Sequence, residues 1–463
     1  MPLLTAKRDP HWIGCIDFGT AFSKCALVQA VDRAALQSEH VRPLSIGIGR
    51  ASQSLNRYLL PSVVFVGDDR LLFGQDAESA ALDAEQTGRY AFVSSKQYLS
   101  TRDFAELDRK LPQDIDPAAK FTPRDLLQLF LAYLLERAGN DAVEQSLPWP
   151  VPLRVARPAW DPPRAWEGEK ILKALVLDAF ALIDKLGSKL SAEGGLPQKA
   201  ALAALRKLSS EYRIKEDKIF KLTSNGSASV PEATAVAAGA IRDTGRRVVV
   251  VADVGGGTSD FGAFMTGLPR RHVVAEILGS SRILLEAGDY LDRELRRYIL
   301  SAVGPLADDP VARLDVDRLR RRARRNKEDL FSYKELVVQI GGDQPEISLE
   351  RFLSDRPIQA FARRLRKRFL DTLQLAVSCA ESFRQPNGSE PPVEIMLTGG
   401  GHALPMVRAL YEKPGIPWKY VESSVDLVER PEDLDYLDVR PQLAVAIGGA
   451  MRDLPIQTAP LRP

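Results

Sequence analysis

Two short segments of this sequence place an aspartate at the end of an apolar strand and follow it with glycine and threonine. The first is Asp17-Phe18-Gly19-Thr20, and the second, in the other half of the chain, runs from Asp253 to Asp260 with the sequence DVGGGTSD. Each lies between two β-type runs, so each predicts a strand, a tight turn and a second strand. The chain must therefore build two similar hairpins.

The residue types in these turns suit phosphate chemistry. Glycines allow backbone N–H groups to converge on phosphate oxygens, and carboxylates hold a hydrated Mg²⁺ against the same phosphates. The first turn alone is typical of an ordinary loop, but the pair in this order indicates a triphosphate site. The expected phosphate contacts are Gly19, Thr20, Ala21, Gly255, Gly256, Gly257 and Thr258, and the expected metal-holding residues are Asp17, Asp253 and Asp260.

The two turns resemble the phosphate motifs of the actin, Hsp70 and sugar-kinase ATPase superfamily. A third segment, Thr398-Gly399-Gly400-Gly401 after an apolar strand, resembles its adenosine motif. Pro231-Glu232-Ala233-Thr234-Ala235 and 444–450 resemble its connecting helices, whose small residues allow close crossing. The resemblance implies an α/β fold, a two-lobed actin-like ATPase with duplicated ribonuclease H-like subdomains and a nucleotide cleft between the lobes.

Within that superfamily the sequence looks closest to an Hsp70 nucleotide-binding domain. The segment 91–99 resembles the one that carries the Hsp70 catalytic lysine, here Lys96. The resemblance implies that Lys96 orients the attacking water, Glu232 positions water and Mg²⁺, Thr258 contacts the γ-phosphate and Asp260 accepts a proton. A solvated lysine and turn-capping aspartates are the alternatives. Pro158 matches the Hsp70 proline that relays nucleotide state, although a proline after a strand is also an ordinary turn former.

The sequence departs from Hsp70 in three places. Ala21 stands where Hsp70 has a second threonine, so slow hydrolysis is expected. The pair Lys327-Glu328, expected beside the nucleotide base, is closer to the actin type. The sequence therefore leaves open whether adenine or guanine is preferred. The sequence ends soon after Met451, so we expect no Hsp70 peptide-binding part.

The expected domain plan follows the motifs. Lobe I spans 1–245, with its core at 11–45 and 120–245, a small subdomain at 46–119 and a helical insertion at about 166–225. Lobe II spans 246–440, with its core at 246–280 and 355–440 and a small subdomain at 281–354; a helix returning to lobe I and a tail occupy 441–463. The insertion is either a partner-docking element or a decoration without function.

Composition excludes several classes of protein. A net charge of +2 over 463 residues, with 45% hydrophobic residues, argues against disorder and against a general polyanion binder. No secretory signal or apolar span is recognisable, so a cytoplasmic protein away from membranes is expected. The three cysteines are expected to be reduced core residues, and the four histidines lack metal-ligand spacing, so Mg²⁺ carried with ATP or ADP is the only metal expected.

A dense arginine run is the strongest remaining signal. It comprises Arg318, Arg320, Arg321, Arg322, Arg324 and Arg325, and a second basic cluster lies at 363–368. No aromatic residues interleave with these arginines, so a solvated or partner-facing surface is favoured over nucleic-acid binding.

Together these features favour an Hsp70-like slow ATPase that acts as a nucleotide-dependent chaperone or protein-interaction switch with a protein client or partner. The alternatives are an actin-like filament ATPase, a small-molecule kinase of the same superfamily, and a regulator that binds nucleotide without hydrolysing it.

Overall fold

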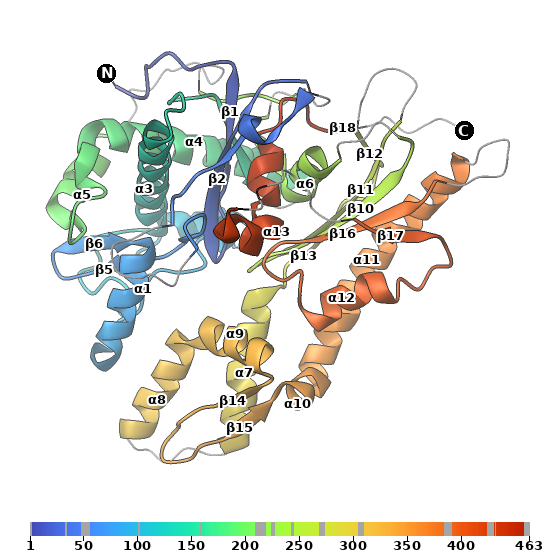
Figure 1. Cartoon of the computed structure of the whole chain (residues 1–463). Helices are drawn as coiled ribbons and strands as arrows, with labels where there is room; N and C mark the ends of the chain where they lie inside the picture. Colours follow the sequence, from blue (N-terminus) through green and yellow to red (C-terminus); the bar gives the residue numbers. More distant parts are fainter. Residues whose placement is uncertain are drawn as a thin grey trace.

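The computed structural model describes residues 2–32, 35–47, 56–100, 102–157, 160, 162–208, 219–223, 227–241, 245–267, 274–303, 310–383, 391–423, 430 and 432–457. It confirms a mixed α/β fold with several sheets (Figure 1). Two large sheets lie at the centre of the molecule, one from each half of the chain. No helix in the described part of the chain is long and apolar enough to span a membrane.

The first large sheet has the strand order β3-β2-β1-β7-β9, and β4 also pairs with β2. Strand β2 is antiparallel to β1 and β3, whereas β7 is parallel to β1 and β9 is parallel to β7. The bounds are Trp12–Asp17 for β1, Phe22–Gln29 for β2, Val41–Pro43 for β3, Leu60–Pro61 for β4, Leu153–Arg157 for β7 and Ser229–Pro231 for β9.

The second large sheet repeats this plan in the order β12-β11-β10-β16-β17, with β18 beyond β12 and β13 paired to β11. Its first two pairings are antiparallel and the next two are parallel, as in the first sheet. The bounds are Val248–Val254 for β10, Ser259–Met265 for β11, Ala275–Glu276 for β12, Arg282–Leu284 for β13, Val393–Thr398 for β16, Tyr420–Glu422 for β17 and Ile456–Gln457 for β18. The two expected hairpins are confirmed, and the halves share one strand topology.

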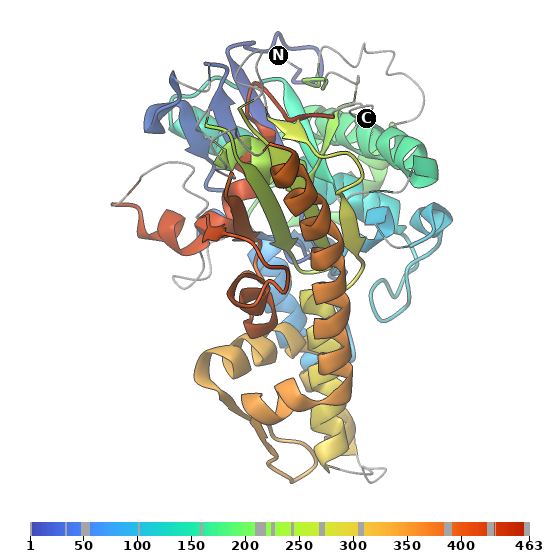
Figure 2. The same ribbon diagram turned by 90° about the vertical axis from the view of Figure 1, so that its right-hand side faces the viewer.

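Two helices of small residues, α6 (Glu232–Ala240) and α13 (Leu434–Gly449), pack between the two sheets (Figure 1). A Cβ atom at Gly448 would lie 1.8 Å from the carbonyl oxygen of Ala235, so only glycine permits this crossing. The expectation of close-crossing helices is confirmed. The outer faces of the sheets are covered by α3 (Pro123–Glu144) and by the long helix α11 (Arg356–Ser382), which Figure 2 shows running along the second sheet.

The insertion is the expected helical pair, α4 (Pro162–Leu186) and α5 (Gln198–Leu205). Helix α4 packs along α3 through a buried apolar face. Between the helices, β8 (Leu196–Pro197) joins β5 (Val64–Val66) and β6 (Arg70–Phe73) in a small sheet beside α1 (Gly74–Asp83) and the short α2 (Gln97–Ser100). The insertion is therefore part of the body of the first half.

The remaining elements form a separate lower region in Figure 1. They are α7 (Gly288–Val303), α8 (Pro310–Arg321), α9 (Ala323–Tyr333), the hairpin β14 (Glu335–Val337) with β15 (Glu346–Ser348), and α10 (Leu349–Ser354); α12 (Pro405–Glu412) follows β16. Arg322 separates α8 from α9. The β14–β15 hairpin was not expected.

Candidate functional site

Three glycine turns meet where the two large sheets face each other. A Cβ atom at Gly257 would lie 2.6 Å from Thr20 Oγ1, and one at Gly256 would lie 3.3 Å from the backbone nitrogen of Ala21. In the third turn Gly399 has φ +82° and a Cβ there would lie 2.4 Å from Asp253 Oδ1. Contacts this close require residues without a side chain. Glycine at these positions therefore allows the three backbones to come together.

The two aspartates occupy equivalent positions in the two hairpins. Asp17, at the end of β1, faces Lys24 across the β1–β2 pair, and Asp253, near the end of β10, faces Asp260 across the β10–β11 pair. Parallel pairing places Thr398 beside Asp253. The strand ends therefore bring acidic groups from both halves of the chain to one place.

A buried ion-pair network joins these strand ends to two other segments. Lys24 Nζ lies 2.5 Å from Asp17 Oδ2, and Lys96 Nζ lies 3.9 Å from Asp17 Oδ1. Lys96 also donates to Glu232 at the start of α6. Because Lys96 is only 5% exposed, the alternative of a solvated lysine is wrong.

Burial and neighbouring charges perturb two groups of the network. Burial lowers the pKa of Lys96, but the charges of Glu232 and Asp17 outweigh it, so its pKa lies above the usual value and Lys96 stays protonated at neutral pH. Burial raises the pKa of Asp253 well above its usual value, and Glu232, Asp260 and Asp17 raise it further. Negative charge therefore accumulates around Asp253.

The donor set suits a divalent cation beside an anion. Four buried carboxylates, of Asp17, Glu232, Asp253 and Asp260, surround the two ammonium groups of Lys24 and Lys96, which leaves an excess of negative charge. Within the described residues no three acidic, histidine or cysteine groups converge as direct metal ligands. An ion here would be held mostly through water, which is how Mg²⁺ usually binds.

The site encloses a cavity of about 70 Å³. Pockets for small-molecule ligands typically measure about 300–1,000 Å³, so this cavity is too small for such a ligand unless the turns separate. The expected residues that line the cavity are Asp17, Gly19, Thr20, Ala21, Lys96, Glu232, Asp253, Gly255, Gly256, Gly257, Thr258, Gly399 and Gly400. Residues from five distant segments of the sequence are thus brought together.

Four expected residues do not line this cavity. Asp260 and Gly401 lie directly behind it, since Asp260 pairs with Asp253 and the Gly401 N–H donates to the Val254 carbonyl at 2.8 Å. Lys327 forms an ion pair with Asp292 at 2.8 Å. The Glu328 side chain is 56% exposed and lies 3.8 Å from Arg324.

Sequence reasoning missed Lys24, which lines the cavity together with Phe22, Gln442 and Val445. Lys24 is the one charged residue of the strand FSKCALVQ, and a buried strand tolerates a lysine only if it is paired. That pattern could have identified it. Gln442 follows Pro441 inside α13, and nothing in the local sequence distinguishes it.

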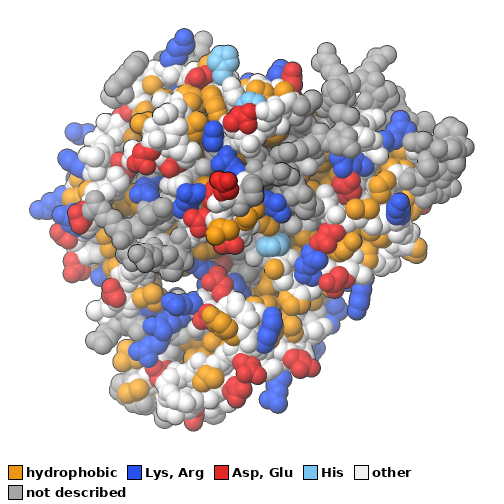
Figure 3. Space-filling view, viewed as in Figure 1, with side chains coloured by type: hydrophobic (Ala, Val, Ile, Leu, Met, Phe, Trp, Pro, Cys, Tyr) orange, Lys and Arg blue, Asp and Glu red, His pale blue; other side chains and the backbone are white. Residues whose placement is uncertain are grey.

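Contacts between the lower region and the first half close one side of the site. Arg324 Nη2 lies 2.5 Å from Glu78 Oε1 on α1, and its guanidinium stacks on Phe22. Ser94 and Gln97 both donate to Asp289 Oδ2, at 2.9 and 3.0 Å. Figure 3 shows Lys and Arg side chains beside the indentation that separates these regions on this face.

These contacts correct the interpretation of the arginine run. The guanidinium groups of Arg320 and Arg321 lie over the ring of Tyr90, 4.2 and 4.6 Å from its centroid, and the Tyr90 hydroxyl donates to Asp317 at 2.5 Å. The expectation of a solvated or partner-facing surface is wrong for the partly buried Arg321 and Arg324, whereas Arg320 remains exposed. All three arginines contact the first half of the same chain. The spacing of residues along the sequence does not reveal a contact of this kind.

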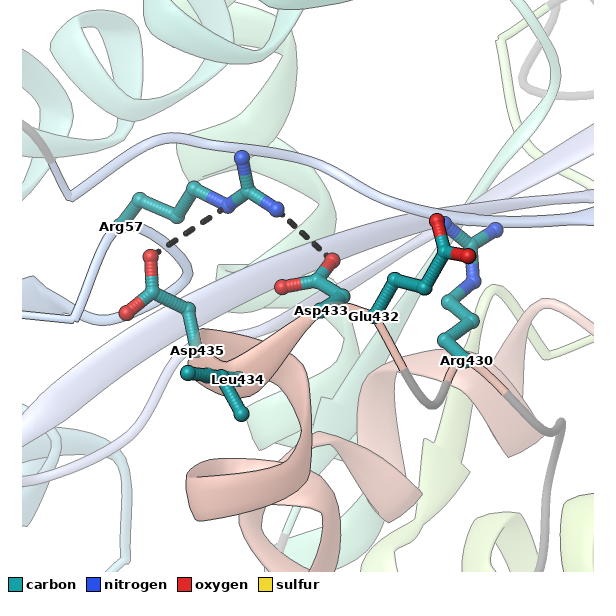
Figure 4. Close-up of a pocket in the computed structure, with 6 residues that line it drawn as sticks. All are labelled: Arg57, Arg430, Glu432, Asp433, Leu434 and Asp435. Atoms are coloured by element: carbon teal, nitrogen blue, oxygen red, sulfur yellow. Dashed lines mark ion pairs between the residues drawn. The ribbon is translucent and has the colours of Figure 1, made fainter.

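A second pocket lies at the start of α13 (Figure 4). Arg57 contacts Asp433 at 2.7 Å and Asp435 at 3.6 Å, so its charge is balanced by its own neighbours. These pairs fix α13 to the first half and give no reason to assign chemistry to the pocket.

Cys15, Cys25 and Cys379 are free thiols. Cys15 and Cys25 are buried, as expected, whereas Cys379 is only partly buried. Pro158 lies outside the described residues. No protein-family model matches this sequence, and no curated protein matches it significantly.

Proposed function

We propose that this protein is a two-lobed, actin-like ATPase of the actin and Hsp70 superfamily, with an Hsp70-like nucleotide-binding region that acts as a slow, nucleotide-dependent protein-interaction switch. The observation that carries the proposal is the meeting of three glycine turns with a buried network of carboxylates and lysines. The repeated strand topology supports it, because a duplicated ribonuclease H-like subdomain places equivalent hairpins opposite each other.

The residues fit Mg-ATP in two groups. Backbone N–H groups of the turns at 19–21 and 255–258, with Lys24 and Lys96, form the anion-binding side. Asp17 and Asp253, with Glu232 and Asp260 close by, would hold a hydrated Mg²⁺, which when bound offsets charge on the phosphate oxygens. The turn containing Gly399 and Gly400 would border the nucleoside.

Hydrolysis needs a positioned water and an acceptor for its proton. The water oxygen would attack the γ-phosphorus, the bond to the bridging oxygen would break, and ADP would leave with that electron pair. Lys96, fixed between Glu232 and Asp17, orients the water and balances developing charge. The resemblance assigns the proton to Asp260, which pairs with Asp253 and lies just behind the cavity.

The switch would act through the contacts that close the cleft. Nucleotide entry requires the turns to separate, and the Arg324–Glu78 pair and the Asp289 hydrogen bonds stand in the way of that movement. Binding energy from the phosphates would be needed to favour the closed form with ligand inside. A protein partner would then distinguish closed from open surfaces.

The test is Mg-ATP binding and turnover by the full chain, with product analysis. We expect micromolar binding that requires Mg²⁺, and slow release of ADP and phosphate. Lys96→Ala should lower turnover on the order of 10²–10³-fold, the effect of losing one preorganised electrostatic contact. The matched control is Lys185→Ala, an exposed lysine on α4.

Two outcomes would remove the proposal: no Mg-dependent nucleotide binding, or unchanged turnover in Lys96→Ala. Pelleting with ATP would favour the actin-like filament, and a phosphorylated small molecule would favour the kinase. Binding without turnover would favour the regulator.

A further inference from the structure

The insertion helix α4 contacts the segments that carry both members of the Lys96–Glu232 pair. One contact runs through Glu169 of α4. It accepts a hydrogen bond from the Ala228 N–H at 2.7 Å and another from the Ser229 hydroxyl. Because β9 begins at Ser229 and Glu232 opens α6 directly after β9, Glu169 fixes the segment from which Glu232 projects.

The second contact runs through Trp160, just before α4. Its indole N–H donates to the Leu99 carbonyl at 3.0 Å. Leu99 and Ser100 both donate their N–H groups to the Lys96 carbonyl, at 2.9 and 3.0 Å. The Trp160 ring thus holds the turn that begins at Lys96.

Trp160 is itself fixed against the insertion. A Cβ atom at Gly168 of α4 would lie 2.9 Å from two ring carbons of Trp160, so the helix leaves room for the indole by using glycine. On another side the guanidinium of Arg157 lies 4.9 Å from the ring centroid. Arg157 Nε also donates to the Ser229 hydroxyl at 2.8 Å, which joins the two contacts into one network.

Arg157, which belongs to this network, interacts with acidic residues of the site. Burial lowers the pKa of Arg157, and the charges of Glu169, Asp260, Glu276 and Glu232 oppose that shift. Arg157 pairs with Pro231 across the parallel β7–β9 strands, next to Glu232. The network therefore lies directly behind the Lys96–Glu232 pair and connects it to the insertion.

We propose that Trp160 and Glu169 are positioning residues for ATP turnover, through which the insertion sets the geometry of Lys96 and Glu232. This inference rests on the proposed ATPase function. It gives the insertion a role in the reaction, whereas one earlier alternative was a decoration without function. A displacement of about 1 Å in a positioned group costs on the order of 10²-fold in rate, and partial loosening should cost less.

The experiment uses Trp160→Phe, which removes the N–H donor and keeps a ring, and Glu169→Ala, which removes both acceptors. Each has a matched control on an exposed residue of α4, Trp166→Phe and Glu167→Ala. Glu169→Gln, which keeps an acceptor for Ala228, serves if the alanine variant folds poorly. Steady-state ATP turnover and backbone hydrogen exchange of the nucleotide-free protein are measured for each.

We expect kcat to fall on the order of tenfold in both variants, with KM and melting temperature near those of the unchanged protein. Hydrogen exchange should rise at 96–100 in Trp160→Phe and at 228–234 in Glu169→Ala, and the controls should match the unchanged protein. Unchanged kcat in both variants overturns the inference, whatever the exchange shows. If the unchanged protein neither binds nor hydrolyses ATP, the proposed function fails; the exchange comparison then decides alone whether α4 holds the two segments.

Discussion

The two hairpins at the site share a backbone plan and differ in charge. In the first, Asp17 faces Lys24 across the strands and has Lys96 as a further neighbour. In the second, the equivalent Asp253 faces Asp260, and Glu232 adds more negative charge. One topology has therefore been used twice, with a cation-rich turn on one side and an anion-rich turn on the other.

Under the proposed function, this difference in charge would give the two halves different roles. Two buried lysines beside glycine N–H groups suit the phosphate oxygens, whereas clustered carboxylates suit a hydrated divalent cation. If the hairpins were interchangeable, neutralising a residue in either would have the same effect. Substitutions that change the charge of one hairpin at a time separate these possibilities.

Among substitutions within the two hairpins, the largest effect is expected from Lys24→Met, which removes a cation from the first hairpin at nearly constant length. Nucleotide affinity should fall about thirtyfold, equivalent to about 2 kcal/mol, because a charge-assisted contact is lost and Asp17 keeps only its longer pair with Lys96. Calorimetry with Mg-ATP and with adenosine measures the loss. ATP should be affected and adenosine should not.

The control for this prediction is Lys185→Met on the exposed surface of α4. Equal weakening of ATP and adenosine by Lys24→Met would point to a general loss of structure. It would contradict a phosphate role for the first hairpin.

The sequence predicted the parts of this site that follow a local rule. Asp17, Asp253 and the glycine turns stand at strand ends, where alternation and turn chemistry can be recognised. The apolar strand β10, which carries Asp253 near its end, was found for the same reason. The pair of similar hairpins then predicted one shared phosphate site.

The parts that the sequence could not supply depend on contacts between distant segments. Arg320, Arg321 and Arg324 look like a surface run until Tyr90 and Glu78 are placed opposite them. Short edge strands such as β12 and β18 are defined by their partners and have no pattern of their own. The contact of Glu169 with Ser229 likewise joins residues whose proximity only the fold creates.

An intermediate effect is expected from Asp253→Asn in the second hairpin. The pKa of Asp253 is raised in the folded protein. Its carboxyl group therefore stays protonated above the usual carboxyl range near pH 4, where the same group in the unfolded chain has lost its proton. Its contribution to stability therefore falls as pH rises from that range toward the folded pKa. Asparagine imitates the protonated form, so the nucleotide-free variant should melt roughly 2–4 °C higher at pH 8, the shift produced by about 1 kcal/mol. It should show no gain near pH 4.

Thermal melts from pH 4 to pH 8 without nucleotide or Mg²⁺ make this comparison, and Asp17→Asn is the matched variant in the first hairpin. Neutralising Asp17 removes part of the negative charge that balances the two buried lysines. That variant should therefore have a lower melting temperature at pH 8. Shifts of the same sign in both variants would refute the charge difference between the hairpins.

An effect of similar size is expected from Gly257→Ala, which tests how closely the two turns approach. The added Cβ would lie 2.6 Å from Thr20 Oγ1 and 3.2 Å from Thr20 Cγ2, so the Thr20 side chain or the turn must shift. Overpacking of this kind typically costs about 1 kcal/mol or somewhat more. Thr20→Ala removes both atoms, so the double variant should regain most of the loss, and a double-mutant cycle of melting free energies measures the coupling. Additive single effects would mean that the turns do not touch in solution, and the closed arrangement of the two hairpins would then be wrong.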